Sequence, residues 1–85
     1  MVEKQMTVKL ENGLQARPVA EFVQIANNFK SNIRVQYSDK KVNAKSIMGM
    51  MSLGIAKGEA ITVVADGEDE EQAVSDIEKY ISCEA

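Results

Sequence analysis

The sequence predicts a two-layer α+β domain in which a four-stranded antiparallel sheet carries three helices on one face, in the order βαββαβα. Segments with alternating apolar residues are interspersed with segments whose apolar residues recur at helical spacing. Each predicted helix has a single apolar stripe, so the helices are expected to cover one sheet face and leave the other in water. With 85 residues, 45% hydrophobic and 27% charged, the chain is expected to form one globular domain, residues 1–85.

The first strand is predicted where Met6, Val8 and Leu10 alternate with polar residues. Asn12-Gly13 is a turn signal after it. A helix follows, with Pro18 in its first turn, where the missing N–H would have no intrahelical partner. The predicted buried stripe of this helix consists of Val19, Phe22, Val23, Ala26 and Phe29.

The remaining strands are predicted in the middle of the chain. Residues 33–37 alternate as a second strand, Ser38-Asp39 is a tight turn, and residues 41–43 form a short return strand. Residues 60–65 are β-rich and continuous enough for an inner strand. Asp66-Gly67 ends this strand.

The last helix is predicted to begin with a capping box formed by Asp69 and Gln72. Glu70 and Glu71 complement the positive end of the helix dipole, so the acidic run at 68–71 has a structural explanation. The buried face of this helix is expected to comprise Ala73, Val74, Ile77, Tyr80 and Ile81.

Residues 43–53 are the most informative stretch, because a hydroxyl beside a lysine runs into a methionine-rich segment. Ser46 is predicted to cap a short helix by accepting from the backbone N–H of Met48 or Gly49. So short a helix cannot bury methionines all round. Some of its apolar side chains should therefore face water, drawn from Ile47, Met48 and Met51.

Two interpretations of this stretch remain open on local pattern alone. One is a capped core helix in which the methionines fill space. The other is a phosphate acceptor at Ser46, because a phosphoserine, with a charge of about −1.5 to −2 at neutral pH, would meet free N–H groups and the positive end of the helix dipole. The fold would tolerate the phosphate there, and the added charge would act on a partner.

Composition argues against several classes of function. The net charge of −3 does not favour bulk nucleic-acid binding, although Arg17, Lys40, Lys41 and Lys45 could form a local positive patch. The single cysteine, Cys83, allows no intrachain disulfide, and no secretory signal or long apolar run is visible, so we expect a cytoplasmic protein. The absence of histidine removes most metal sites and histidine-based catalysis, and no cofactor is expected.

Two motifs point to a known family. Residues Gly13-Leu14-Gln15-Ala16-Arg17-Pro18 and Lys45-Ser46-Ile47-Met48-Gly49 resemble those of the HPr family, the small phosphocarriers of the bacterial sugar phosphotransferase system. The resemblance covers essentially the whole chain and implies the HPr-like open-faced two-layer sandwich. HPr proteins carry the phosphoryl group on a histidine of the first motif, at the position of Gln15. With the serine motif intact, this sequence resembles the Crh branch, the catabolite repression HPr-like proteins.

Gln15 changes the function that the resemblance implies. A carboxamide nitrogen, whose lone pair is delocalised into the carbonyl, cannot form a phosphoramidate, so phosphoryl relay is not expected. The resemblance implies instead a regulatory protein that is not an enzyme. HPr kinase/phosphorylase would phosphorylate Ser46, and the product would bind catabolite control protein A, a LacI-type repressor, as a corepressor. DNA contact would belong to the repressor.

The resemblance also implies residue roles. Ser46 would be the phosphoacceptor, Arg17 would steady the phosphate or reach an acidic group on the partner, and Gln15 would keep a neutral hydrogen bond. The surface expected to bind partners comprises Gln15, Ala16, Arg17, Ala20, Lys45, Ile47, Met48 and Met51.

Other functions compete with this one. A working phosphocarrier is disfavoured by Gln15, and an enzyme that uses Ser46 or Cys83 as nucleophile has no identifiable general base. A phosphorylation-gated binder of a metabolic enzyme would use the same methionine surface. The protein is expected to be a monomer, or a homodimer that exchanges its first strand about a hinge at Asn12-Gly13.

Overall fold

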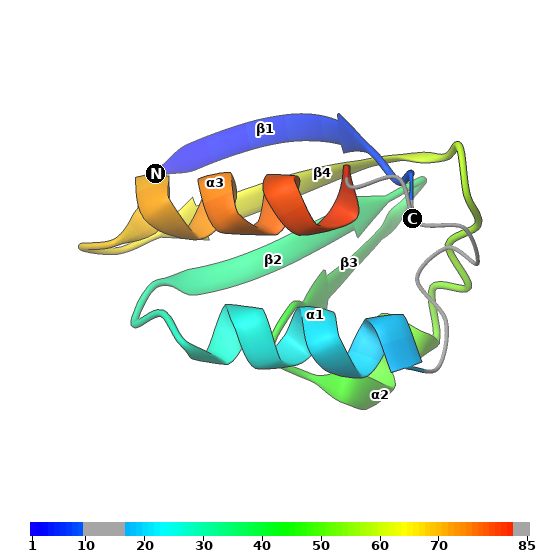
Figure 1. Ribbon diagram of the computed structural model, residues 1–85, viewed down its shortest axis with the longest axis horizontal. Helices are drawn as coiled ribbons and strands as arrows, with labels where there is room; N and C mark the ends of the chain where they lie inside the picture. Colours follow the sequence, from blue (N-terminus) through cyan, green and yellow to red (C-terminus); the bar gives the residue numbers. More distant parts are fainter. Residues whose placement is uncertain (10–16, 83–85) are drawn as a thin grey trace.

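One antiparallel sheet forms the base of the molecule, with its strands in the order β1-β4-β2-β3 (Figure 1). The computed structural model describes residues 1–9 and 17–82, with Arg17 described by its backbone only. The central strand β4 pairs with both β1 and β2, as the predicted inner strand requires. The strands are β1 (Val2–Thr7), β2 (Asn32–Tyr37), β3 (Lys40–Asn43) and β4 (Ala60–Asp66).

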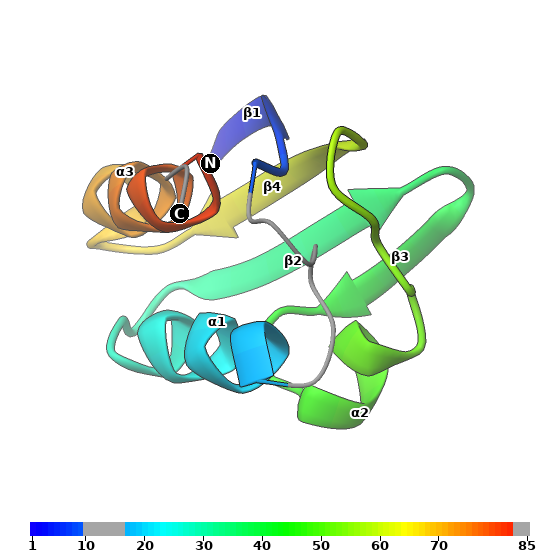
Figure 2. The same cartoon turned by 45° about the vertical axis from the view of Figure 1, so that its right-hand side comes forward.

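The helices lie on one face of this sheet (Figure 2). They are α1 (Arg17–Asn27), α2 (Ile47–Met51) and α3 (Glu70–Ile81). Helix α3 packs over β1 and β4, α1 contacts both other helices, and α2 contacts β3. The predicted α+β architecture and element order are confirmed. No helix among the residues described is long and apolar enough to span a bilayer.

The core lies between the sheet and the helices. Val63 of β4 pairs with Val35 of β2, and both are fully buried, whereas the next residue, Val64, pairs with exposed Arg34 on the open face. Burying each such side chain contributes roughly 1.5–3 kcal/mol. The predicted stripe of α1 is confirmed, with Phe29 half-buried just beyond the helix. In α3, Tyr80 is only partly buried, and the other predicted core residues are buried.

The first strand begins earlier than predicted. Met6 and Val8 are buried as expected, but β1 runs from Val2 to Thr7, and Leu10 lies outside the described residues. The reason is pairing, because β4 is long enough to offer Ala65 as a partner for Val2. Val8 continues the contact past the strand by donating its N–H to the carbonyl of Glu59 at 2.9 Å.

The predicted capping box at the start of α3 is wrong. Asp69 is the N-cap residue, but its side chain makes no capping hydrogen bond. Its carboxylate accepts from the N–H of Lys30 at 2.9 Å, from the N–H of Ser31 at 3.0 Å and from the Ser31 hydroxyl. Gln72 donates to Asp76 instead, at 2.7 Å. Ser31 is only 1% exposed, and a buried hydroxyl needs a partner, so the carboxylate is drawn away from the helix.

We expect Asp69→Asn to lower the melting temperature at neutral pH. The hydrogen bond from the Ser31 hydroxyl, followed by that from the N–H of Lys30, holds the pKa of Asp69 below its usual value. A carboxyl whose pKa folding lowers stabilises the fold above its unfolded pKa, and this stabilisation is lost as pH falls through the folded pKa. The difference from the wild type should therefore shrink in acid.

Thermal unfolding followed by circular dichroism at neutral and successively more acidic pH measures this. Asp76→Asn is the matched control, since Asp76 only accepts from Gln72 one turn earlier on the same helix. Equal melting temperatures of Asp69→Asn and wild type at every pH would contradict the proposed role of the carboxylate.

Candidate functional site

Ser46 follows a turn that is fixed by hydrogen bonds to the side chain and the backbone of Asn43. The side-chain oxygen of Asn43 accepts from the N–H of Lys45 at 2.8 Å, and the Asn43 carbonyl accepts from the N–H of Ser46 at 3.0 Å. Ala44 is fully buried, and its N–H donates to the carbonyl of Ile33 on β2 at 2.9 Å. The sheet therefore sets where Ser46 stands.

Ser46 is the N-cap of α2, as predicted. Its hydroxyl oxygen accepts from the N–H of Gly49 at 3.2 Å, and its carbonyl accepts from the N–H of Met50 at 3.0 Å. Its backbone is extended, with φ −107° and ψ 116°, the conformation usual for an N-cap. The side chain is exposed, so the hydroxyl caps the helix while remaining accessible to a second molecule.

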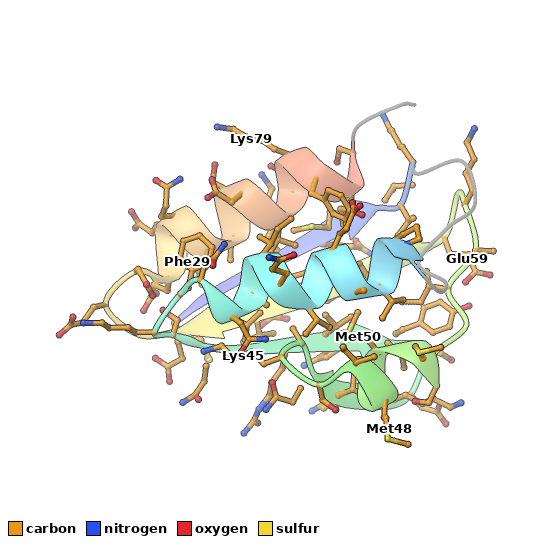
Figure 3. The ribbon with its side chains drawn as sticks, turned by 60° about the horizontal axis from the view of Figure 1, so that its bottom comes forward. Phe29, Lys45, Met48, Met50, Glu59 and Lys79 are labelled. Carbon is orange, nitrogen blue, oxygen red and sulfur yellow. The ribbon has the colours of Figure 1, made fainter. Side chains whose placement is uncertain are left out.

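Helix α2 carries an exposed apolar surface beside Ser46. Ile47 is 47% exposed, Met48 84% and Met51 52%, whereas Met50 is fully buried. In Figure 3, Met48 points away from the molecule and Met50 points inward. Three of the four large apolar side chains exposed in the described ranges belong to this helix. Only Met50 fits the interpretation of a core helix, and we call the other three residues, Ile47, Met48 and Met51, the α2 surface.

Lys45 is engaged with its own chain. Its ammonium group donates to the carbonyl of Phe29 at 2.8 Å, just beyond the C-terminal end of α1 (Figure 3). A cation at that end is favourable, because the helix dipole is negative there. This bond ties the Ser46 turn to α1, and a role of Lys45 toward a partner stays a prediction. Of the other predicted basic residues, Lys40 and Lys41 lie exposed on β3.

The remaining predicted partner-binding residues belong to the start of α1 and the segment before it. Ala20 is exposed on α1, the helix that packs against α2. Gln15 and Ala16 lie outside the described residues, as does the side chain of Arg17, whose backbone begins α1. The structure thus places Ser46, Ala20 and the α2 surface on two neighbouring helices.

Two polar side chains near the site, those of Ser52 and Tyr80, make contacts that were missed from the sequence. The Ser52 hydroxyl donates to the carbonyl of Gly49 at 2.6 Å and closes the C-terminal end of α2. The Tyr80 hydroxyl donates to Glu21 at 2.9 Å and lies 3.3 Å from the carbonyl oxygen of Pro18, joining α3 to the first turns of α1. A partly buried tyrosine needs a partner for its hydroxyl, and this was the available signal. Among the described side chains, no group of three or more His, Cys, Asp or Glu is placed to hold a metal ion.

Comparison with known sequences relates the chain to HPr and HPr-like proteins. Residues 2–82 match the family model described as "PTS HPr component phosphorylation site". The chain is 55% identical over 84 residues to a protein named HPr-like protein Crh from Halalkalibacterium halodurans, covering 99% of this chain and 100% of the relative. It is 49% identical over 81 residues to HPr-like protein Crh from Bacillus subtilis, covering 95% of each.

Solved structures show the same fold. The phosphocarrier protein HPr from Bacillus anthracis superposes with a TM-score of 0.92 at 50% identity, covering 94% of this chain and 95% of that one. The crystal structure of Crh from Bacillus subtilis, described as revealing an unexpected swapping domain in a dimer, gives a TM-score of 0.78 at 48% identity, covering 100% of this chain and 98% of that one.

A negative charge is expected to have opposite effects at the two ends of α2. Ser46→Asp should keep the cap to Gly49 and place charge at the positive end of the helix dipole, leaving stability unchanged or raising it by about 0.3–1 kcal/mol. Ser52→Asp places the same charge at the negative end and removes the hydroxyl donor to Gly49, so stability should fall. Urea unfolding of both variants beside the wild type measures this. Effects of the same sign would contradict the capping geometry.

Proposed function

The chain belongs to the HPr family, and we propose that it acts as a regulatory protein of carbon catabolite repression that is switched by phosphorylation of Ser46. One observation carries the proposal. The exposed Ser46 hydroxyl stands at the N-terminal end of α2, directly beside the exposed α2 surface. A modifiable group and an apolar contact area therefore lie together.

The geometry suits a phosphate that acts through a partner. The first N–H groups of a helix lack intrahelical partners and stabilise an adjacent anion, so phosphorylation of Ser46 leaves α2 formed. Guanidinium or ammonium groups of the partner would pair with the phosphate in charge-assisted hydrogen bonds. The flexible thioethers of Met48 and Met51 would adapt to the partner's apolar surface.

Histidine phosphotransfer is not part of this proposal. The chain contains no histidine, and Gln15 stands where the family's phosphorylated histidine is expected. An amide nitrogen is not a nucleophile that can carry a phosphoryl group. The names of the relatives, which include "catabolite repression", support a regulatory role.

The proposed partners follow from this role. HPr kinase/phosphorylase would transfer phosphate from ATP to Ser46, and catabolite control protein A, a LacI-type repressor, would bind the phosphorylated form as a corepressor. With a net charge of −3, this chain would leave DNA contact to the repressor. A metabolic enzyme is a second candidate partner, because exposed methionines accommodate more than one surface.

Mass spectrometry tests the switch directly. We expect one phosphate after incubation with HPr kinase and ATP, its loss in Ser46→Ala, and its retention in Ser52→Ala, which removes the other hydroxyl of the same short helix. We expect none after incubation with phosphoenolpyruvate and enzyme I of the sugar system. A stable phosphate from phosphoenolpyruvate would overturn our interpretation of Gln15. Pull-down with phosphorylated and unphosphorylated bait then separates the repressor from a metabolic enzyme.

We also propose that the protein can exchange β1 between two copies. In the closed chain, β1 pairs with β4 from Val2 to Thr7, and the ammonium of Lys4 lies 2.8 Å from a carboxylate oxygen of Glu78 on α3. An exchanged β1 would make these same contacts on its partner, so the dimer costs little free energy beyond that of association itself. The swapped dimer reported for the relative from Bacillus subtilis supports this possibility.

A charge-reversal pair tests the exchange. Lys4→Glu and Glu78→Lys each place like charges together when β1 closes on its own chain. When the two variants are mixed, only exchanged strands bring opposite charges together in both halves, so a heterodimer should form that neither variant gives alone. Native mass spectrometry and light scattering measure it, and the double variant in one chain is the control. A mixture that stays monomeric at every concentration would argue against exchange.

A further inference from the structure

Gly49 differs from the other glycines that the structure describes. Gly54 and Gly58 have φ values of +58° and +91°, which L side chains rarely adopt. Gly67 is in close contact with the neighbouring loop, since a Cβ there would lie 2.6 Å from the Cα of Ser31. The fold therefore explains these three residues. Gly49 lies inside α2 with ordinary helical backbone, so its conformation does not require glycine.

Packing does not require glycine at this position either. A Cβ on residue 49 would lie 3.4 Å from the Cβ of Val42, which is a van der Waals distance. Glycine also weakens a helix relative to alanine, because it loses more conformational freedom on folding. Helix α2 has only five residues, so a glycine inside it lowers the stability of a large part of the helix. The fold shows no packing or backbone feature that offsets this loss.

The other residue that a side chain at position 49 would contact is Ser46, the proposed phosphoacceptor. A Cβ on residue 49 would lie 3.4 Å from the hydroxyl oxygen of Ser46 and 3.5 Å from its Cβ. A methyl group there would occupy space on one side of the oxygen that is exposed and available for reaction. This placement links the unexplained glycine to the chemistry of Ser46.

We propose that Gly49 is a positioning residue that keeps the Ser46 hydroxyl open to an incoming phosphoryl group, an inference that rests on the proposed function. In the transfer, the Ser46 oxygen forms a bond to the γ-phosphorus of ATP, the bond from that phosphorus to the bridging oxygen breaks, and ADP leaves. The hydroxyl proton passes to a base of the kinase. The entering and leaving oxygens must lie nearly in line, with three further oxygens around the phosphorus. A methyl group beside Ser46 crowds that arrangement.

The test compares Gly49→Ala with Gly54→Ala. Gly49→Ala should be at least as stable as the wild type in urea, while kcat/KM for its phosphorylation by HPr kinase falls about tenfold or more, mainly through kcat. Gly54→Ala introduces a Cβ with no neighbour within 4 Å at a residue with φ +58°. It should therefore lose stability while its folded form is phosphorylated at close to the wild-type rate.

The outcomes separate this inference from the proposed function. If the wild type accepts phosphate and Gly49→Ala accepts it equally fast, the inference is overturned and the proposed function stands. If Gly49→Ala is markedly less stable than the wild type, the fold explains the glycine and the inference is also overturned. A wild type that the kinase does not phosphorylate removes the proposed function and the inference together.

Discussion

The single covered face of the sheet is the constraint from which the candidate site follows. All three helices must bury their apolar residues against one layer, where α3 packs over β1 and β4 and α1 contacts both other helices. The short α2 contacts β3, which is one of the two edge strands, and only Met50 of this helix is fully buried in the core. The other large apolar side chains of α2 therefore remain at the surface, beside the residue that caps the helix.

At this edge position the backbone of the site is well fixed, while the apolar side chains of the α2 surface are exposed. The turn before Ser46 is bonded to β2 through Ala44 and to the end of α1 through Lys45. Because the Lys45 ammonium is taken up by the carbonyl of Phe29, the nearest basic side chain in the sequence is already engaged. Under the proposed function, the charge on Ser46 is then available to be read by cations of the partner.

Local features of the chain were predicted from the sequence, and long-range polar contacts were not. The order of elements, the Ser46 cap and the exposed α2 residues depend on spacing within a few positions. The start of β1 was missed because Lys4, which pairs with buried Val63 on the helix side of the sheet, is polar and hides the alternation. Its ammonium reaches Glu78, more than seventy positions away in the sequence.

The difference between local features and long-range contacts also explains why the contacts of Asp69 and Lys45 were not predicted. Asp69 has the sequence context of a capping residue, but its partner is Ser31 in a loop that is distant in the sequence. No local pattern predicts a contact between the two residues. The bond from Lys45 to Phe29 likewise joins two elements that only the folded sheet brings together. For Gln15 and Ala16, which lie outside the described residues, the resemblance remains the basis of the prediction.

The apolar character of the α2 surface is not explained by folding. Burial of apolar area stabilises a protein only in proportion to the area removed from water, and Met48 leaves most of its surface in solvent. Polar residues of similar helix propensity, such as glutamine or lysine, would serve the isolated fold as well at these positions. Clustered exposed apolar side chains are instead typical of surfaces that a partner covers. Met50 is fully buried and stabilises the fold, whereas Ile47, Met48 and Met51 keep about half or more of their surface in solvent, so the α2 surface can change at less cost to the core.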